Sequence, residues 1–95
     1  MSENLVFPVP DQVAADAWAD NDKYLEMYQA SVDDPEAFWG EQGKRIDWIK
    51  PYSQVKDADF SGDVNIKWYY DGTLNASYNC LDRHLATRGD QTAII

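Results

Sequence analysis

The sequence predicts an α+β fold: a small, mainly helical segment of about three helices with a short antiparallel hairpin and a C-terminal strand. Helix-start residues stand at Asn21, Asp34 and Asn75, and an alternating run over residues 65–70 precedes an Asp-Gly pair typical of hairpins. Thirteen aromatic residues (Trp 4, Tyr 6, Phe 3) among 95 predict a chain that buries surface rather than a disordered one.

Residues 1–19 are expected to form an extended N-terminal arm. Pro8 and Pro10 interrupt regular structure, and a short run that includes Trp18 is compatible with one helical turn. We expect this arm to pack on something larger. Residues 20–95 form the rest of the chain, without a repeat, a low-complexity tract or a flexible linker.

The run NDKYLEMYQASVD predicts an amphipathic helix from Asn21. Asn21 is a capping-type residue, and Asp22 lies in the first turn, where the helix dipole favours a negative charge. The apolar residues of this run fall on one helical stripe: Tyr24, Leu25, Tyr28 and Val32.

A second helix has the clearest start signal. Asp34 is the predicted N-cap, and Pro35 takes the first helical position, where its missing N–H costs nothing. Glycines at positions 40 and 43 each weaken a helix by about 1 kcal/mol relative to alanine, which indicates a closely approaching backbone or a shorter helix. The helix must end before Pro51, and we expect its end near Asp47.

In the alternating run, Trp68 and Tyr70 should share one face of a strand and Tyr69 the other, before the hairpin dipeptide Asp71-Gly72. The run NASYNCLDRHLATRG then predicts a third helix, capped by Asn75 or Ser77 and terminated at Gly89.

The final QTAII predicts a strand from Thr92. Such a strand must pair along an edge and bury its faces, and the sequence offers only a short hairpin besides. We therefore interpret the chain as the opening segment of a longer one, whose larger domain supplies the missing strands. For the fragment alone, we expect loose packing or self-association through the unpaired strand.

The charge excludes two classes of partner. The formal net charge is −9, from 17 acidic and 8 basic side chains, and phosphate-rich surfaces attract the opposite sign. We expect neither a nucleic acid nor a membrane partner. The single cysteine and the lack of a signal-peptide pattern at the start of the sequence favour a cytoplasmic setting.

The stretch DADFSGDVNIKW resembles a calcium loop in part. Asp57, Asp59 and Ser61 occupy its first, third and fifth positions, and Gly62 its sixth. The twelfth position is Trp68, where a glutamate should complete the coordination, so an Asx-rich turn before a strand is the better interpretation.

For three other motifs we prefer a structural explanation to a functional one. Cys80 and His84 are one helical turn apart, but no second Cys or His joins them, and a lone helical Cys is usually a small buried hydrophobe. We expect His84 near the surface or bonded to the backbone. The RGD of residues 88–90 is explained by helix termination, and Asp33 and Asp34 by capping and solvation. We therefore name no catalytic, cofactor-binding or metal-ligating residue.

The aromatic run of residues 68–70 could bind sugars or bases, but we expect core and interface positions instead. Large aromatic residues dominate protein contacts, and we take three of them as candidate anchors: Trp39, Trp48 and Trp68.

Several blocks in order resemble one known family. DPEAFWGEQ, IDWIKPY, IKWYYDGTLNASYNCLDRHL and GDQTAII, which together cover about residues 20–95, look like the N-terminal segment of AMP-forming acetyl-CoA synthetases, members of the adenylate-forming superfamily. The resemblance implies that residues 20–95 are the N-terminal domain of such an enzyme, cut before its large adenylation domain.

The resemblance also implies an activity for the whole enzyme: acetate and ATP give acetyl-adenylate and pyrophosphate, and the acetyl group then passes to CoA. ATP, Mg and CoA serve the full enzyme, and we expect none of them to be bound by this fragment, whose implied partner is the large domain of the same chain. Two alternatives stay open: a related propionyl-CoA synthetase, and a free-standing interaction module without catalysis.

Overall fold

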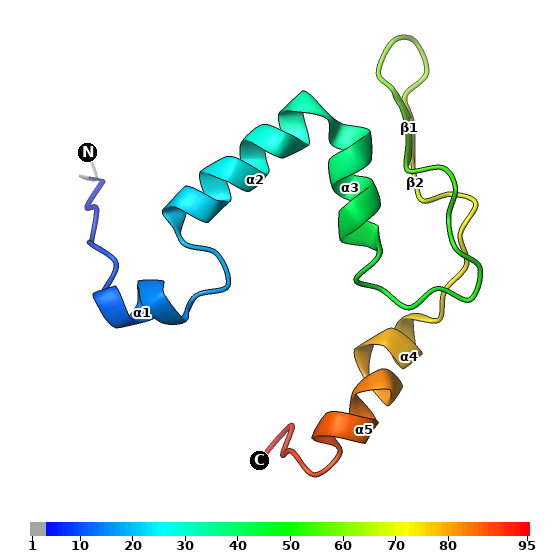
Figure 1. Cartoon of the computed structure of the whole chain (residues 1–95). Helices are drawn as coiled ribbons and strands as arrows, with labels where there is room; N and C mark the ends of the chain where they lie inside the picture. Colours follow the sequence, from blue (N-terminus) through cyan, green and yellow to red (C-terminus); the bar gives the residue numbers. More distant parts are fainter. Residues whose placement is uncertain (1–3) are drawn as a thin grey trace. The chain divides into compact units, whose positions relative to one another are not determined.

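The computed structural model describes residues 4–95, so the first three residues of the predicted arm lie outside the described part (Figure 1). The chain divides into two units, the first ending at Pro35 and the second spanning Glu36–Ile95. The described residues form helices and one antiparallel hairpin, which confirms the predicted α+β class with a mainly helical content.

The first unit contains helices α1 (Asp11–Asp16) and α2 (Asn21–Asp33). Helix α1 directly follows Pro10, so a helix of 6 residues lies within the arm. Helix α2 is where the sequence predicts it, but its cap is Asp20, whose carboxylate accepts a 2.8 Å hydrogen bond from the backbone N–H of Lys23. The prediction of Asn21 as the capping residue is wrong by one position.

Helix α3 (Pro35–Gly43) has Pro35 at the first helical position as predicted, and its remaining residues open the second unit. The helix ends at Gly43 and not near Asp47. After Gly43 the chain continues in tight turns. The backbone N–H groups of Lys44, Arg45 and Ile46 each donate to the carbonyl of the residue three positions earlier. The glycine signal therefore marked a shorter helix.

The hairpin pairs β1 (Lys56–Asp59) with β2 (Asn65–Trp68) in antiparallel register, and Figure 1 shows the loop that connects them at the upper right. The turn lies at residues 60–64, where Gly62 has a φ of 71°. Asp71-Gly72 is thus not the hairpin turn. That pair instead leads into Thr73, which forms an isolated antiparallel bridge with Lys50.

The predicted third helix is divided into three short pieces: α4 (Ala76–Cys80), a 3₁₀ turn (Asp82–His84) and α5 (Leu85–Arg88). The break falls at Leu81, whose φ of −124° and ψ of −69° are not helical. Asn75 is the N-cap, since its side chain accepts from the N–H of Tyr78 at 3.0 Å. Gly89 follows the last piece with a right-handed backbone conformation, so this position does not need the positive φ that glycine readily adopts.

The strand predicted from Thr92 is not formed, because residues 92–95 have no regular structure. A strand needs a neighbour for its backbone hydrogen bonds, and the hairpin strands pair with each other. Ile94 and Ile95 are almost fully exposed.

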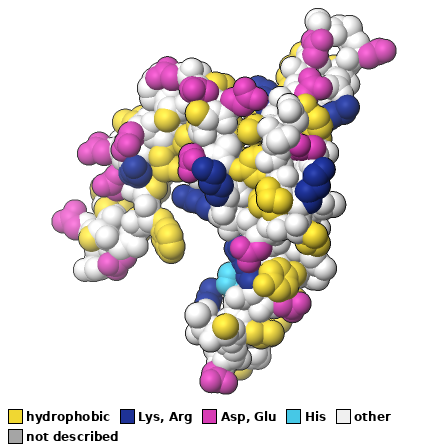
Figure 2. All heavy atoms as spheres, turned by 45° about the vertical axis from the view of Figure 1, so that its right-hand side comes forward, with side chains coloured by type: hydrophobic (Ala, Val, Ile, Leu, Met, Phe, Trp, Pro, Cys, Tyr) yellow, Lys and Arg dark blue, Asp and Glu magenta, His cyan; other side chains and the backbone are white. Residues whose placement is uncertain are grey.

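Very little of this chain is a core. Val55, at 9% exposure, is the only buried hydrophobic side chain among residues 4–95. Figure 2 shows hydrophobic atoms at the surface, interspersed with acidic side chains. The local hydrogen bonds and aromatic contacts described below therefore carry most of the order within the second unit.

Candidate functional site

Aromatic side chains gather around the C-terminal end of α3. The ring centroids of Trp48 and Tyr52 are 5.0 Å apart, and Tyr69 lies 4.7 Å from Tyr52 and 5.7 Å from Trp48. We call these three residues the aromatic cap. Each ring lies at an angle to its neighbours, in the arrangement that the charge distribution of aromatic rings favours.

The polar groups of the aromatic cap all donate to carbonyls of α3. Tyr52 O–H donates to Gly40, Trp48 Nε1 donates to Gly43 at 2.8 Å, and Tyr69 O–H donates to Trp39 at 2.6 Å. A helix leaves its last four carbonyls without helical partners. Here two of those four accept from aromatic side chains, and the other two accept from the turns that follow the helix.

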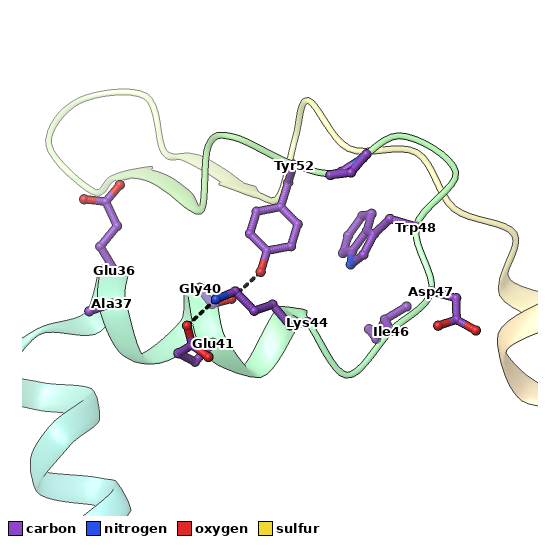
Figure 3. Close-up of a pocket in the computed structure, with 10 residues that line it drawn as sticks. Glu36, Ala37, Gly40, Glu41, Lys44, Ile46, Asp47, Trp48 and Tyr52 are labelled. Carbon is purple, nitrogen blue, oxygen red and sulfur yellow. Dashed lines mark hydrogen bonds and ion pairs between the residues drawn. The ribbon is translucent and has the colours of Figure 1, made fainter.

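Figure 3 shows how Tyr52 points its hydroxyl at Gly40, with Trp48 beside it.

Two glycines make room for the rings of Tyr52 and Trp48. A Cβ on Gly43 would lie 2.6 Å from Tyr52 Oη, and a Cβ on Gly72 would lie 2.7 Å from Trp48 Cζ3. Gly43 therefore admits an aromatic side chain. Of the two explanations that the sequence offers for the glycines, the shorter helix is confirmed at Gly43, and an approaching side chain takes the place of the closely approaching backbone.

Tyr69 has an unusual backbone. Its φ of 47° is in the left-handed region, which is uncommon for residues other than glycine. This conformation ends the strand alternation, so Tyr69 contacts both Trp48 and Tyr52. Burial among these rings raises the pKa of its hydroxyl.

The carboxylate of Asp71 fixes the turn that residues 69–72 form. It accepts from the backbone N–H groups of Ser53 and Gln54 at 2.9–3.0 Å and from the Ser53 hydroxyl. These bonds, that of the hydroxyl foremost, lower the pKa of Asp71 from 3.8 to about 2. The turn at residues 69–72 is thereby tied to the chain that leads into β1.

A second tie joins α4 to the segment after α3. The Asn79 amide accepts from Asp47 N–H at 2.7 Å and donates to the Asp47 carbonyl at 2.9 Å, as a neighbouring strand would. Arg83 adds a 2.9 Å hydrogen bond to the Arg45 carbonyl. Sequence patterns gave no signal for either contact, because the partners are more than 30 positions apart.

Two open hollows flank these contacts. One, of about 780 Å³, is lined by Glu41 of α3, by Lys44 of the turn that follows the helix, and by Trp48 and Tyr52 (Figure 3). The other, of about 420 Å³, is almost wholly apolar. We call it the Trp groove, and its lining residues are Trp39, Gln42, Gly43, Ile46, Trp68 and Tyr69.

Of the three predicted anchors, Trp48 is engaged within the segment itself. Trp39 and Trp68 lie edge to face with ring centroids 5.9 Å apart, and they remain 39% and 42% exposed. They are therefore available for a contact outside this chain, whereas Trp48 serves the aromatic cap.

The residues of the partial calcium motif take part in the hairpin and its turn. Asp57 and Asp59 lie in β1, and Asp59 accepts from the hydroxyl and N–H of Ser61 at 2.7 and 2.8 Å. These bonds lower the pKa of Asp59, the hydroxyl bond most. The result is the Asx turn that the sequence favours. Within residues 4–95, no three His, Cys, Asp or Glu side chains converge as metal ligands.

The other motif residues also have local roles. His84 Nε2 lies 3.1 Å from the carbonyl of Asn79, in agreement with the expected backbone contact. Cys80 is exposed, so its prediction as a buried residue is wrong, because α4 presents it on an uncovered face. Arg88 Nε donates a hydrogen bond to Gln91 at 2.8 Å, and Asp33 accepts one from Gln29 at 2.7 Å.

Every helix within residues 4–95 is too short or too polar to span a bilayer.

Comparison with known proteins identifies the family. A family model described as the acetyl-coenzyme A synthetase N-terminus matches residues 24–80. Acetyl-coenzyme A synthetase of Psychromonas ingrahamii is 58% identical over the whole chain, and the enzyme of that name from Syntrophobacter fumaroxidans is 59% identical over 95% of it. The enzyme from Vibrio cholerae is again 58% identical over the whole chain. The chain spans only about 15% of the length of these relatives, and it belongs to the acetyl-coenzyme A synthetase N-terminus family.

Proposed function

We propose that this chain is the structural N-terminal segment of an AMP-forming acetate–CoA ligase. The full-length enzyme joins acetate to ATP, releasing pyrophosphate, and then transfers the acetyl group from acetyl-adenylate to the thiol of CoA, releasing AMP. The names of the relatives support this activity, as does their identity over the whole chain. In this proposal, ATP, Mg²⁺ and CoA bind in the part of the enzyme outside this chain.

The main support for a structural role is the exposure of the apolar side chains. Both units present large hydrophobic residues to solvent, and Val55 has the one buried hydrophobic side chain among residues 4–95. An apolar surface of this extent usually marks a site of contact with protein. We propose that the segment packs on the large adenylation domain, and that each apolar face is covered there.

We propose further that the segment supplies no catalytic group. Catalytic carboxyls usually owe their perturbed pKa to burial and to a charged neighbour in a cleft. The lowered pKa values of Asp59 and Asp71 instead arise from hydrogen bonds to nearby turns, and both support the local fold. A cytoplasmic setting is supported by the single cysteine, Cys80.

Trp68→Ala in the full-length enzyme tests the structural role. We expect a lower melting temperature, with KM values for acetate, ATP and CoA within about twofold of the unchanged enzyme, because the ring serves packing and not substrate binding. Phe60→Ala is the matched control, since Phe60 is exposed in the hairpin loop and lies outside the Trp groove. A tenfold loss of kcat/KM at an unchanged melting temperature would overturn the structural role.

The activity has its own test. Purified full-length enzyme is incubated with ATP, Mg²⁺ and CoA plus either acetate or propionate, and AMP and the acyl-CoA are measured. We expect acetate to be used with the higher kcat/KM. Preference for propionate would place the enzyme with the propionyl-CoA synthetases, and absence of AMP with either acid would refute the ligase proposal.

A further inference from the structure

The Trp groove has the composition of a contact site for an apolar side chain. Trp39 and Trp68 form its walls, and Ile46 is exposed at its edge. The polar side-chain groups among its lining residues are the Gln42 amide, the indole N–H groups of the two tryptophans and the Tyr69 hydroxyl, which already donates to the Trp39 carbonyl. Small-molecule sites bring several polar groups together to fix a ligand. A hydrocarbon or aromatic group suits this surface better.

The walls of the groove are held in place before anything binds. The Tyr69 hydroxyl bonds the backbone at Trp39, and the two indoles meet edge to face. Lys56 Nζ lies 5.6 Å from the ring centroid of Trp68, so a cation already contacts this ring. An occupant would therefore find two ordered indoles, and preordered aromatic pockets supply much of the affinity of protein contacts.

The charge of the chain argues against a second copy as the occupant. Each copy carries a formal charge of −9, so two copies that dock face to face would repel each other. The relatives supply a different occupant: about 85% of their length lies outside the part that this chain matches.

We infer that the Trp groove is the principal anchoring pocket of the segment, and that an aliphatic or aromatic side chain from the polypeptide beyond residue 95 of the same enzyme molecule fills it. This inference rests on the proposed function. It goes further by assigning the anchoring contact to one groove, between α3 and β2, among the many exposed apolar residues.

Photo-crosslinking in the full-length enzyme tests the inference. Gln42→p-benzoylphenylalanine places a photoreactive group at the groove, and Phe60→p-benzoylphenylalanine places the same group in the hairpin loop as a control. The crosslinked peptides are identified by mass spectrometry. Mixing enzyme of natural isotope composition with uniformly labelled enzyme separates crosslinks within one molecule from crosslinks between two.

We expect the Gln42 probe to capture a single peptide from beyond residue 95 in the same molecule, at least fivefold more efficiently than the Phe60 probe captures any peptide. A crosslink that falls within residues 4–95, or one between a labelled and an unlabelled molecule, would overturn the inference. Equal capture by both probes would overturn it as well, because the groove would then have no special part in the contact.

Hydroxyl-radical footprinting of the unmodified enzyme provides a second measurement that does not depend on a variant. With an empty groove, Trp39 and Trp68 would be oxidised at the rate of partly exposed tryptophans, because they are 39% and 42% exposed. With the groove filled, we expect oxidation to be at least fivefold slower than that. Active enzyme with readily oxidised indoles would refute this inference alone, and enzyme with protected indoles but no acetyl-CoA synthesis would refute the proposed activity alone.

Discussion

Gly43→Ala should destabilise the second unit, although alanine is the better helix former. Within a helix, the replacement of glycine by alanine ordinarily stabilises by about 1 kcal/mol. Here the new Cβ would lie 2.6 Å from Tyr52 Oη and 2.9 Å from Cε1 and Cζ of the same ring. Overpacking of this kind costs about 1–3 kcal/mol, and displacement of the Tyr52 hydroxyl from Gly40 costs about 1 kcal/mol more. The net expectation is a loss of about 1–3 kcal/mol.

Gly40→Ala in the same helix is the matched control. A Cβ at this position would lie 3.6 Å from Val55 Cγ2, which is an ordinary van der Waals contact. The same substitution should therefore leave stability unchanged or raise it by up to about 1 kcal/mol. Both glycines lie in the last turn of α3, Gly43 at its final position. The difference between the variants therefore reports mainly the fit of Tyr52 against α3.

Hydrogen–deuterium exchange of the full-length enzyme, followed for the peptides of residues 36–55, measures the effect locally. A loss of 1–3 kcal/mol corresponds to about 5- to 150-fold faster exchange for amides that exchange through local opening. In a Tyr52→Ala background, Gly43→Ala should lose most of its cost, because the clashing ring is absent. If Gly43→Ala exchanges as slowly as Gly40→Ala, the close approach of Tyr52 has no energetic weight and the reasoning is refuted.

Three further predictions concern the ties around the aromatic cap. Asp71→Asn should speed amide exchange at Ser53. The stabilisation from the Asp71 carboxylate should be complete above its ordinary pKa of 3.8 and disappear as the pH falls through about 2, because the pKa is lowered in the folded state. Protection of Ser53, relative to the intrinsic exchange rate at each pH, that stays constant over this range would contradict this. Asn79→Ala leaves both backbone groups of Asp47 without their amide partner and should destabilise α4 by about 1–3 kcal/mol, seen as faster exchange of its amides, whereas unchanged exchange would show that water replaces the amide. Asn75→Ala removes the N-cap of α4 and should cost about 1 kcal/mol, with Asn75→Asp retaining most of the stability; equal exchange in the two variants would argue against a capping role.

The elements that the sequence predicts correctly are those with local signals. Pro35 and Asn75 mark helix starts through their own backbone and side-chain chemistry, and both stand where expected. Strand β1 is missed because KDAD has one apolar residue and no β-branched residue, so it forms only by pairing with β2. The Asp71-Gly72 pair is wrongly predicted as the hairpin turn. It lies after the hairpin, where the Asp71 carboxylate accepts hydrogen bonds from the backbone of Ser53 and Gln54.

The aromatic cap shows a similar limit. The sequence marks the glycines of α3 as places of close approach, but it does not identify what approaches. Strand alternation places Tyr69 opposite Trp68, whereas its left-handed backbone turns it toward Trp48 and Tyr52. A positive φ at a tyrosine is stabilised by the surrounding contacts and has no signature in the residue itself.

The nearly coreless character of this chain bears on how such an enzyme is made. An N-terminal segment leaves the ribosome first, and at about 5–20 residues per second the several-fold longer remainder of the relatives takes tens of seconds to follow. Throughout that interval, a nascent chain with Val55 as its one buried hydrophobic residue among those described keeps its indoles and aliphatic side chains open to other proteins. Synthesis of the proposed full-length enzyme should therefore depend strongly on chaperones that bind apolar segments, and the net charge of −9 of this segment should keep neighbouring nascent chains on one messenger apart.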